Sequence, residues 1–130
     1  MGFLQVAATI VVVLAALLHV WIFVLESIRW SHPSTWRAFG VRTPEQAEVL
    51  RPMAYNQGFY NLFLAVGALG GLALLFWAGL PYAGRALVLF TTASMTAAAV
   101  VLTTTGSGYL RPGLIQGTLP LIAFVLFLFV

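Results

Sequence analysis

Residues Leu4 to Leu25 read LQVAATIVVVLAALLHVWIFVL, an almost unbroken run of apolar side chains. A helix needs about twenty such residues to cross the hydrocarbon core of a bilayer, so this run predicts a membrane-spanning helix. A cleavable signal peptide explains it less well, because no positively charged segment precedes the run and no small-residue cleavage site follows it. We therefore expect the segment to be retained as the first of several spans.

Three further apolar segments follow along the chain. The 130 residues are 62% hydrophobic and 7% charged, whereas roughly a quarter of the residues in an average soluble domain are charged. A soluble core of so short a chain could not hide that much apolar surface. We predict an all-α integral membrane protein of one domain, 1–130, in which four transmembrane helices at about 4–26, 52–78, 82–105 and 113–130 form an antiparallel bundle.

The charged residues are six arginines and three glutamates, and no basic run occurs among them. Basic and aromatic residues are not interleaved in the pattern that is typical of nucleic-acid-binding surfaces, so we expect no nucleic-acid partner. The chain has no cysteine, which excludes thiol catalysis, disulfides and thiolate metal sites.

Two ionisable residues mark the first predicted span. His19 and Glu26 are seven residues apart, so both fall on one helical strip together with Gln5 and Val12, and we expect this strip to face protein. Ionisable groups within a membrane are costly and often functional, which makes both residues catalytic candidates. In the structural alternative, His19 is a neutral side chain bonded to another helix and Glu26 pairs with Arg29. Both explanations remain open.

The segment 31–51 is the longest extramembrane stretch. Trp30 and Trp36 are predicted to be interfacial anchors, and His32-Pro33-Ser34 is predicted to be a turn in which His32 is solvated. The sequence Thr43-Pro44-Glu45-Gln46 has an N-cap hydroxyl, a proline at the first helical position and a glutamine three residues after the cap. It therefore predicts a short helix on the membrane surface, ending near Leu50.

The second span opens with the polar run Tyr55-Asn56-Gln57-Gly58-Phe59-Tyr60-Asn61. Asn56 with Tyr60, and Gln57 with Asn61, are i,i+4 neighbours on two adjoining faces, so one partner helix could not satisfy both. Amides and phenols at the head of a span are tolerated where other helices bond them or where they line a cavity. The ligand-binding candidates are Tyr55, Asn56, Gln57, Tyr60, Asn61 and, from the last span, Gln116.

Three further features of the sequence concern the hydrogen bonding and the packing of the spans. Pro120 frees the backbone carbonyl of Gln116, which adds an acceptor or simply a kink. The hydroxyls of 103–105 are expected mostly to bond back to their own helix. Gly67 and Gly71 form a G-x-x-x-G that packing within the chain explains as well as dimerisation does.

Four spans place the first and third connections on one side of the membrane and both termini on the other. The first side carries five of the six arginines, and Arg85 alone lies on the other. The positive-inside rule then puts the long first loop in the cytoplasm and the termini outside. The polar residues gather in the same half of the membrane, so we expect one pocket that opens toward the cytoplasm, with His19 as its floor.

Several motifs resemble a domain-of-unknown-function family of small bacterial four-helix membrane proteins, and together they cover nearly the whole chain. They are Leu17-Leu18-His19 through Leu25-Glu26 and Trp30, Ala38-Phe39-Gly40, Asn56-Gln57-Gly58-Phe59-Tyr60-Asn61-Leu62-Phe63-Leu64-Ala65, and Gln116-Gly117 with Pro120. The resemblance implies a four-helix protein of the bacterial cytoplasmic membrane, distantly similar in architecture to DoxX-like proteins. It implies no activity.

Three functions are compatible with these features. The favoured one is a bundle whose pocket binds a small or amphipathic ligand, with an isomerase or hydrolase as its catalytic version if His19 and Glu26 divide acid and base roles. The others are an accessory subunit of a larger membrane complex and a small transporter, acting as a homodimer or larger oligomer. One histidine and one glutamate make a poor metal site, so no metal is expected, and no cofactor is indicated.

Overall fold

The computed structural model describes all residues, 1–130. The elements are α1 (Phe3–Phe23), a π-helical turn (Val24–Ile28), α2 (Pro33–Ala38), α3 (Pro44–Phe76), α4 (Pro81–Thr103), a 3-10 turn (Ser107–Tyr109) and α5 (Leu110–Phe127). There is no strand. The helices α1, α3, α4 and α5 are long and apolar enough to cross a membrane and pack against one another, which confirms the predicted fold class. The chain is thus a multi-pass membrane protein.

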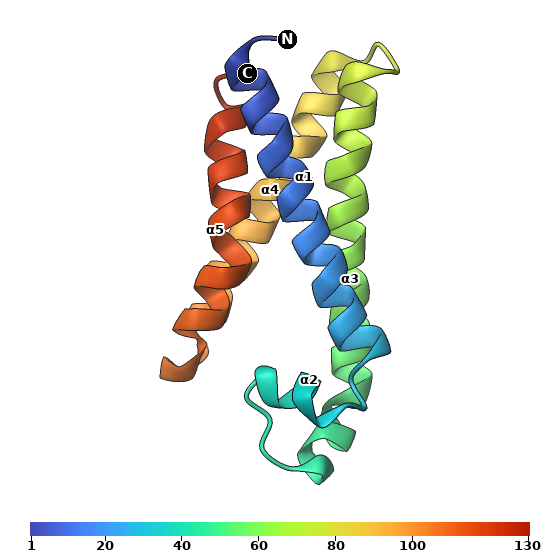
Figure 1. The fold of residues 1–130 in the computed structure, drawn as a ribbon, viewed down its shortest axis with the longest axis vertical. Coiled ribbons are helices and arrows are strands. Elements are labelled where there is room, and N and C mark those ends of the chain that lie inside the picture. The colour runs from blue at the N-terminus through green and yellow to red at the C-terminus, as the bar shows by residue number, and fades with distance from the viewer.

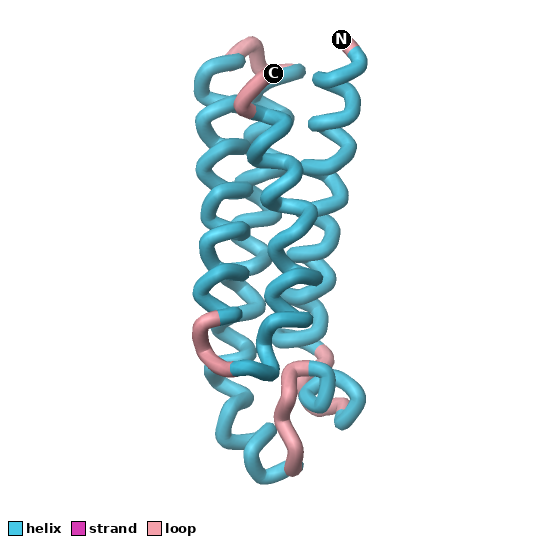
Figure 2. Tube along the Cα trace, turned by 90° about the vertical axis from the view of Figure 1, so that its left-hand side faces the viewer, coloured by secondary structure: helices cyan, strands magenta, loops and turns pink.

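The two termini and the α3–α4 connection lie at one end of the bundle, and α2 and the α4–α5 connection lie at the other (Figure 1). Figure 2 shows the same division from the side, with the loops confined to the two ends of the long helices. Arg85 belongs to the first end, where its guanidinium donates to the Leu128 carbonyl at 2.8 Å and ties α4 to the end of α5. The other five arginines belong to the end with α2.

The interior of the bundle is narrow and built largely from small residues. Only 28 of 130 residues are buried, and large apolar side chains are exposed along all four long helices. That distribution suits a protein whose outer faces meet lipid rather than water. The core residues are Ala8, Val12, Ala15 and Ala16 of α1, Ala65, Ala68 and Leu72 of α3, Val88 and Met95 of α4, and Ala123 and Phe127 of α5.

The helices α3 and α4 cross in close contact through glycines. A Cβ atom at Gly84 would lie 2.6 Å from the Gly71 carbonyl oxygen, and one at Gly71 would lie 2.7 Å from a methyl carbon of Val88. A Cβ at Gly67 would similarly meet Thr91. The G-x-x-x-G of the second span therefore packs against α4 within the chain.

The predicted short helix between the first and second spans is present, but it is α2 (Pro33–Ala38) and not a separate helix that ends near Leu50. Thr43 caps a helix as expected, since its Oγ1 accepts from the Gln46 N–H at 3.2 Å, but this helix is α3, which continues through Pro52 to Phe76. Proline removes only one backbone donor here, and the side chains around it are exposed, so water can satisfy the freed carbonyl. The 33 residues of α3 span roughly 50 Å, more than a bilayer core needs, so part of the helix projects beyond it.

The predicted interfacial anchors lie instead in a small second core. Trp30 and Trp36 are only 7% and 3% exposed and pack with Val41, Ala47 and Ala54. The Trp30 Nε1–H donates to the Ala47 carbonyl at 2.8 Å and so attaches the segment after the π turn to α3. The predicted turn at His32 is in fact the start of α2, although His32 itself is exposed, as expected.

Candidate functional site

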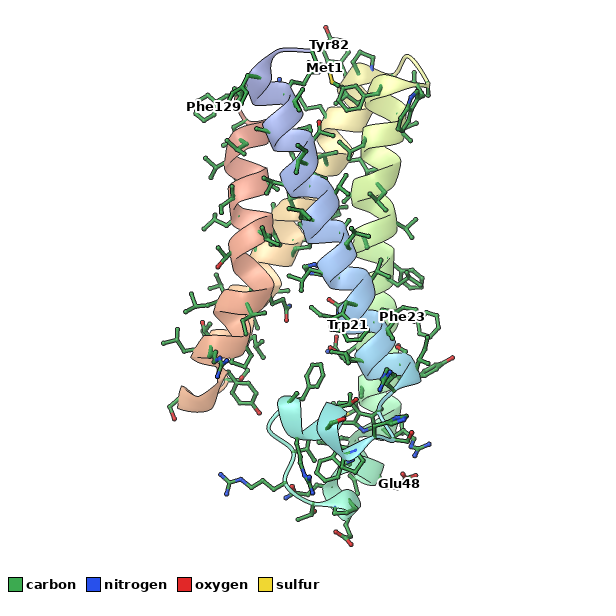
Figure 3. The ribbon with its side chains drawn as sticks, viewed as in Figure 1. Met1, Trp21, Phe23, Glu48, Tyr82 and Phe129 are labelled. Carbon is green, nitrogen blue, oxygen red and sulfur yellow. The ribbon has the colours of Figure 1, made fainter.

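A cavity of about 1070 Å³ lies at the end of the bundle that carries α2. Its walls come from the π turn, from α3, α4 and α5, and from the segment around α2. In Figure 3 this region lies between the lower part of α5, the lower part of α3 and the α2 segment beneath them. It is lined by 21 residues, of which 13 are hydrophobic, so an apolar surface carries a limited set of polar groups.

Five of the eight residues predicted from the sequence line this cavity. They come from three separate elements: Glu26 from the π turn, Gln57, Tyr60 and Asn61 from α3, and Gln116 from α5. Gln57 and Asn61 share one face, and the Asn61 amide also donates to the Gln57 carbonyl at 3.1 Å. The expected convergence of several helices on one polar site is therefore present in the geometry.

The carboxylate of Glu26 has no hydrogen-bond or ion-pair partner. The one ion pair of the chain joins Arg51 and Glu48 at 3.1 Å on an exposed surface. The pairing of Glu26 with Arg29, which the sequence left open, is not formed. Because Glu26 is only partly exposed and faces the cavity, its carboxylate is free to bind a ligand there.

His19 does not line the cavity. It is fully buried in the bundle, where Nδ1 donates to the Ala15 carbonyl one turn earlier at 2.9 Å and Nε2 has no partner. The residues of the predicted strip do face protein, since Val12 and His19 are buried and Gln5 and Glu26 are half-buried. However, the π turn takes more residues per turn than an α-helix, which rotates Glu26 away from the line through His19.

Tyr55 and Asn56 lie on the outer side of α3. Both are exposed and neither lines the cavity. The ring of Tyr55 packs instead against Phe59, with centroids 5.0 Å apart and planes inclined at 57°. The polar run therefore does occupy two faces of α3, and the residues that reach the site are Gln57 and Asn61 of one face and Tyr60 of the other.

The π turn is held against α3 at a glycine. The Ser27 hydroxyl donates to the Tyr55 carbonyl at 2.8 Å, and a Cβ atom at Gly58 would overlap the Ser27 side chain and lie 3.1 Å from its backbone nitrogen. Only glycine allows this approach. Since Ser27 follows Glu26 directly, the contact with Gly58 fixes the place from which Glu26 enters the cavity.

Sequence reasoning missed three polar residues of the lining: Glu45, Gln46 and Tyr109. The first two follow from treating α3 as one helix, because Gln46, Leu50, Met53, Gln57 and Asn61 then recur at i,i+3 and i,i+4 spacing on one face. This helical spacing is visible in the sequence, but the predicted helix break at Pro52 concealed it.

The threonines at the end of α4 contribute little to the site. Thr103, Thr104 and Thr105 each donate to a carbonyl of their own helix at 2.6–2.7 Å, as predicted, and only Thr105 lines the cavity. The helix α5 continues through Pro120, four residues after Gln116. The cavity can therefore offer a carboxylate, amides and phenols to a polar head group and hydrocarbon to an apolar tail.

A family model described as a protein of unknown function, DUF1304, matches residues 13–128 of the chain. No curated protein and no solved structure shows significant similarity to it.

Proposed function

The chain belongs to the DUF1304 family of proteins of unknown function, and we propose that it binds a small amphipathic ligand in the cavity between α3, α4 and α5. The observation that carries this proposal is the unpartnered carboxylate of Glu26, which faces a cavity lined mostly by apolar side chains. A polar group without a partner in such surroundings costs free energy that a bound head group would recover. Pockets between bundle helices are common ligand sites.

The proposal assigns distinct roles to the lining residues. Glu26 is the charged centre, and Gln57, Asn61 and Gln116 are the amides that orient the head group. Tyr60 adds a phenol at the same level. A shared acid and base role for His19 and Glu26 is not part of the proposal, because the imidazole lies in the core and outside the cavity.

We further propose that the protein resides in a bacterial cytoplasmic membrane with the α2 end, and hence the cavity, on the cytoplasmic side. The support is the distribution of arginines, of which five belong to the α2 end and Arg85 alone to the end with the termini. Excess arginine in short loops marks the cytoplasmic side of membrane proteins.

Native mass spectrometry of the protein extracted from its own membrane in a mild detergent tests the ligand. Ala98 lines the cavity and its neighbour Ala97 does not, although both are exposed. We expect the wild type and Ala97→Trp to carry the same reproducible added mass, and Ala98→Trp to lose it because the indole fills the cavity. An identical spectrum for all three proteins would contradict ligand binding.

The same experiment distinguishes the other functions. Release together with defined larger subunits would indicate an accessory subunit. Release as a stable homodimer without added mass would favour a small transporter.

A further inference from the structure

The charged side chains that line the cavity are all acidic. Glu26 and Glu45 both line it, whereas none of the six arginines and neither histidine does. Five arginines lie at the same end of the protein, so the absence of a cation from the lining is not a consequence of a general lack of positive charge nearby. A ligand with an anionic head group would meet two carboxylates and no counter-charge.

The lining also holds four aromatic rings: Trp30, Phe39, Tyr60 and Tyr109. Trp30 and Phe39 form a pair with centroids 5.6 Å apart and planes inclined at 53°. The Trp30 Nε1–H is bonded to the Ala47 carbonyl, which orients the indole. Aromatic rings and carboxylates around one cavity are the surroundings that favour ammonium groups, because ring faces attract cations and a carboxylate supplies the counter-charge.

The remaining lining is suited to a hydrocarbon chain. Leu64 of α3 and Ala98, Val101 and Leu102 of α4 present apolar surface on the walls of the same cavity. Its volume of about 1070 Å³ lies just above the usual range for small-molecule sites. A head group and a chain can therefore be held together.

Building on the ligand-binding function proposed above, we propose that the cavity selects a single-chain amphipath with a positively charged ammonium head group. The ammonium lies against Glu26 and the aromatic rings, and the chain runs along the apolar wall formed by α3 and α4. A phospholipid fits less well, since its phosphate would find no arginine in the lining.

Decyltrimethylammonium, decyl sulfate and the uncharged decyl maltoside provide matched probes with one chain and three head groups. Each is titrated below its micelle concentration into the protein in a polyoxyethylene detergent, and adducts are counted by native mass spectrometry. We expect the ammonium compound to bind the wild type at least tenfold more tightly than the other two. Equal binding of the three compounds would overturn the inference.

Two isosteric variants locate the charge that is responsible. Glu26→Gln should lose at least tenfold in affinity for decyltrimethylammonium, and Glu45→Gln, at an exposed position of the lining, should lose less. Glu48→Gln is the matched control, because Glu48 is exposed, pairs with Arg51 and does not line the cavity. Unchanged affinity in a folded Glu26→Gln protein would overturn the assignment.

The outcomes separate this inference from the function on which it rests. If all three probes bind the wild type equally and Ala98→Trp loses them all, the cavity binds amphipaths without charge selection and only the inference fails. If no probe binds in a way that Ala98→Trp abolishes, the proposed function fails as well.

Discussion

The imidazole of His19 is the one buried side chain with a nitrogen that has no partner. Its Nδ1–H is bonded to the preceding turn of its own helix, so Nε2 faces the core as an unpaired acceptor. An unsatisfied buried acceptor costs about 1–3 kcal/mol, and the imidazole compensates for this by filling volume in the bundle. His19 therefore contributes to packing at the level where the first span meets the other helices.

Replacement of His19 separates packing from binding. His19→Met removes the unpaired nitrogen and nearly keeps the volume, so we expect the free energy of unfolding in detergent to change by less than about 1.5 kcal/mol. His19→Ala leaves a cavity and should cost about 2–5 kcal/mol. Thermal unfolding followed by circular dichroism measures both. Loss of ligand binding in a stable His19→Met protein would contradict the placement of His19 outside the site.

At the scale of single residues, the sequence predicted which side chains are polar within the membrane and only partly predicted where they point. Glu26, Gln57 and Asn61, which were predicted to share a site, line one cavity. His19 and Glu26 both face protein, as the i,i+7 spacing predicted, but only Glu26 lines the cavity. The π turn between them could not be predicted, because no residue type in Val24–Ile28 is characteristic of such a turn. The turn packs against Gly58, which the sequence does not distinguish from the other small residues of a membrane helix.

The π turn and α3 form a single positioning unit. Gly58→Ala would push a methyl group into Ser27 and displace the turn that carries Glu26. We expect this variant to remain folded, because the core of the bundle lies elsewhere, and to bind ligand at least tenfold more weakly.

Removal of the opposing side chain provides the control. Ser27→Gly combined with Gly58→Ala should recover part of the binding, since the methyl group then has room, although the Ser27 backbone nitrogen is still 3.1 Å away. Adduct counting by native mass spectrometry compares the three proteins. Wild-type binding in Gly58→Ala alone would show that the glycine does not position Glu26.

The close crossing of α3 and α4 requires glycine at the point of contact, because a side chain there would collide with the opposite helix. Gly84→Ala places a methyl group against the backbone of α3, which cannot yield as a flexible side chain can, so we expect a loss of about 1–3 kcal/mol in stability. Gly70→Ala is the matched control, because nothing lies within 4 Å of a Cβ there and alanine favours the helix. Equal thermal stability of the two variants would contradict this crossing.

The elements themselves could be predicted except where the chain leaves the membrane. Four apolar runs are sufficient to predict four long helices. The start of α3 at Pro44 was also visible, through the Thr43 cap. The continuation through Pro52 was not, because proline usually marks a helix start and its single lost hydrogen bond matters little at an exposed position. Trp30 and Trp36 were misplaced because the loop around α2 has a core of its own.

At the scale of the whole molecule, the distribution of charged residues predicts how the protein is oriented in the membrane. With five arginines at the α2 end and one at the other, we expect both termini outside the cytoplasm. Alkaline phosphatase fused to the C-terminus should be active, and a green fluorescent protein at the same position should be dark. Bright fluorescence of the second fusion would reverse the orientation and place the cavity on the outer side.

Whether the long helices enclose a cavity that water and ligands can enter is settled by a labelling measurement on two adjacent residues. The chain has no cysteine, so Ala98→Cys and Ala97→Cys each carry a single thiol. In lipid nanodiscs, a charged maleimide that cannot enter lipid should react with Ala98→Cys at least tenfold faster than with Ala97→Cys, because Ala98 lines the cavity and Ala97 does not. Equal rates at the two positions, or faster reaction at Ala97→Cys, would contradict the cavity and the function proposed for it.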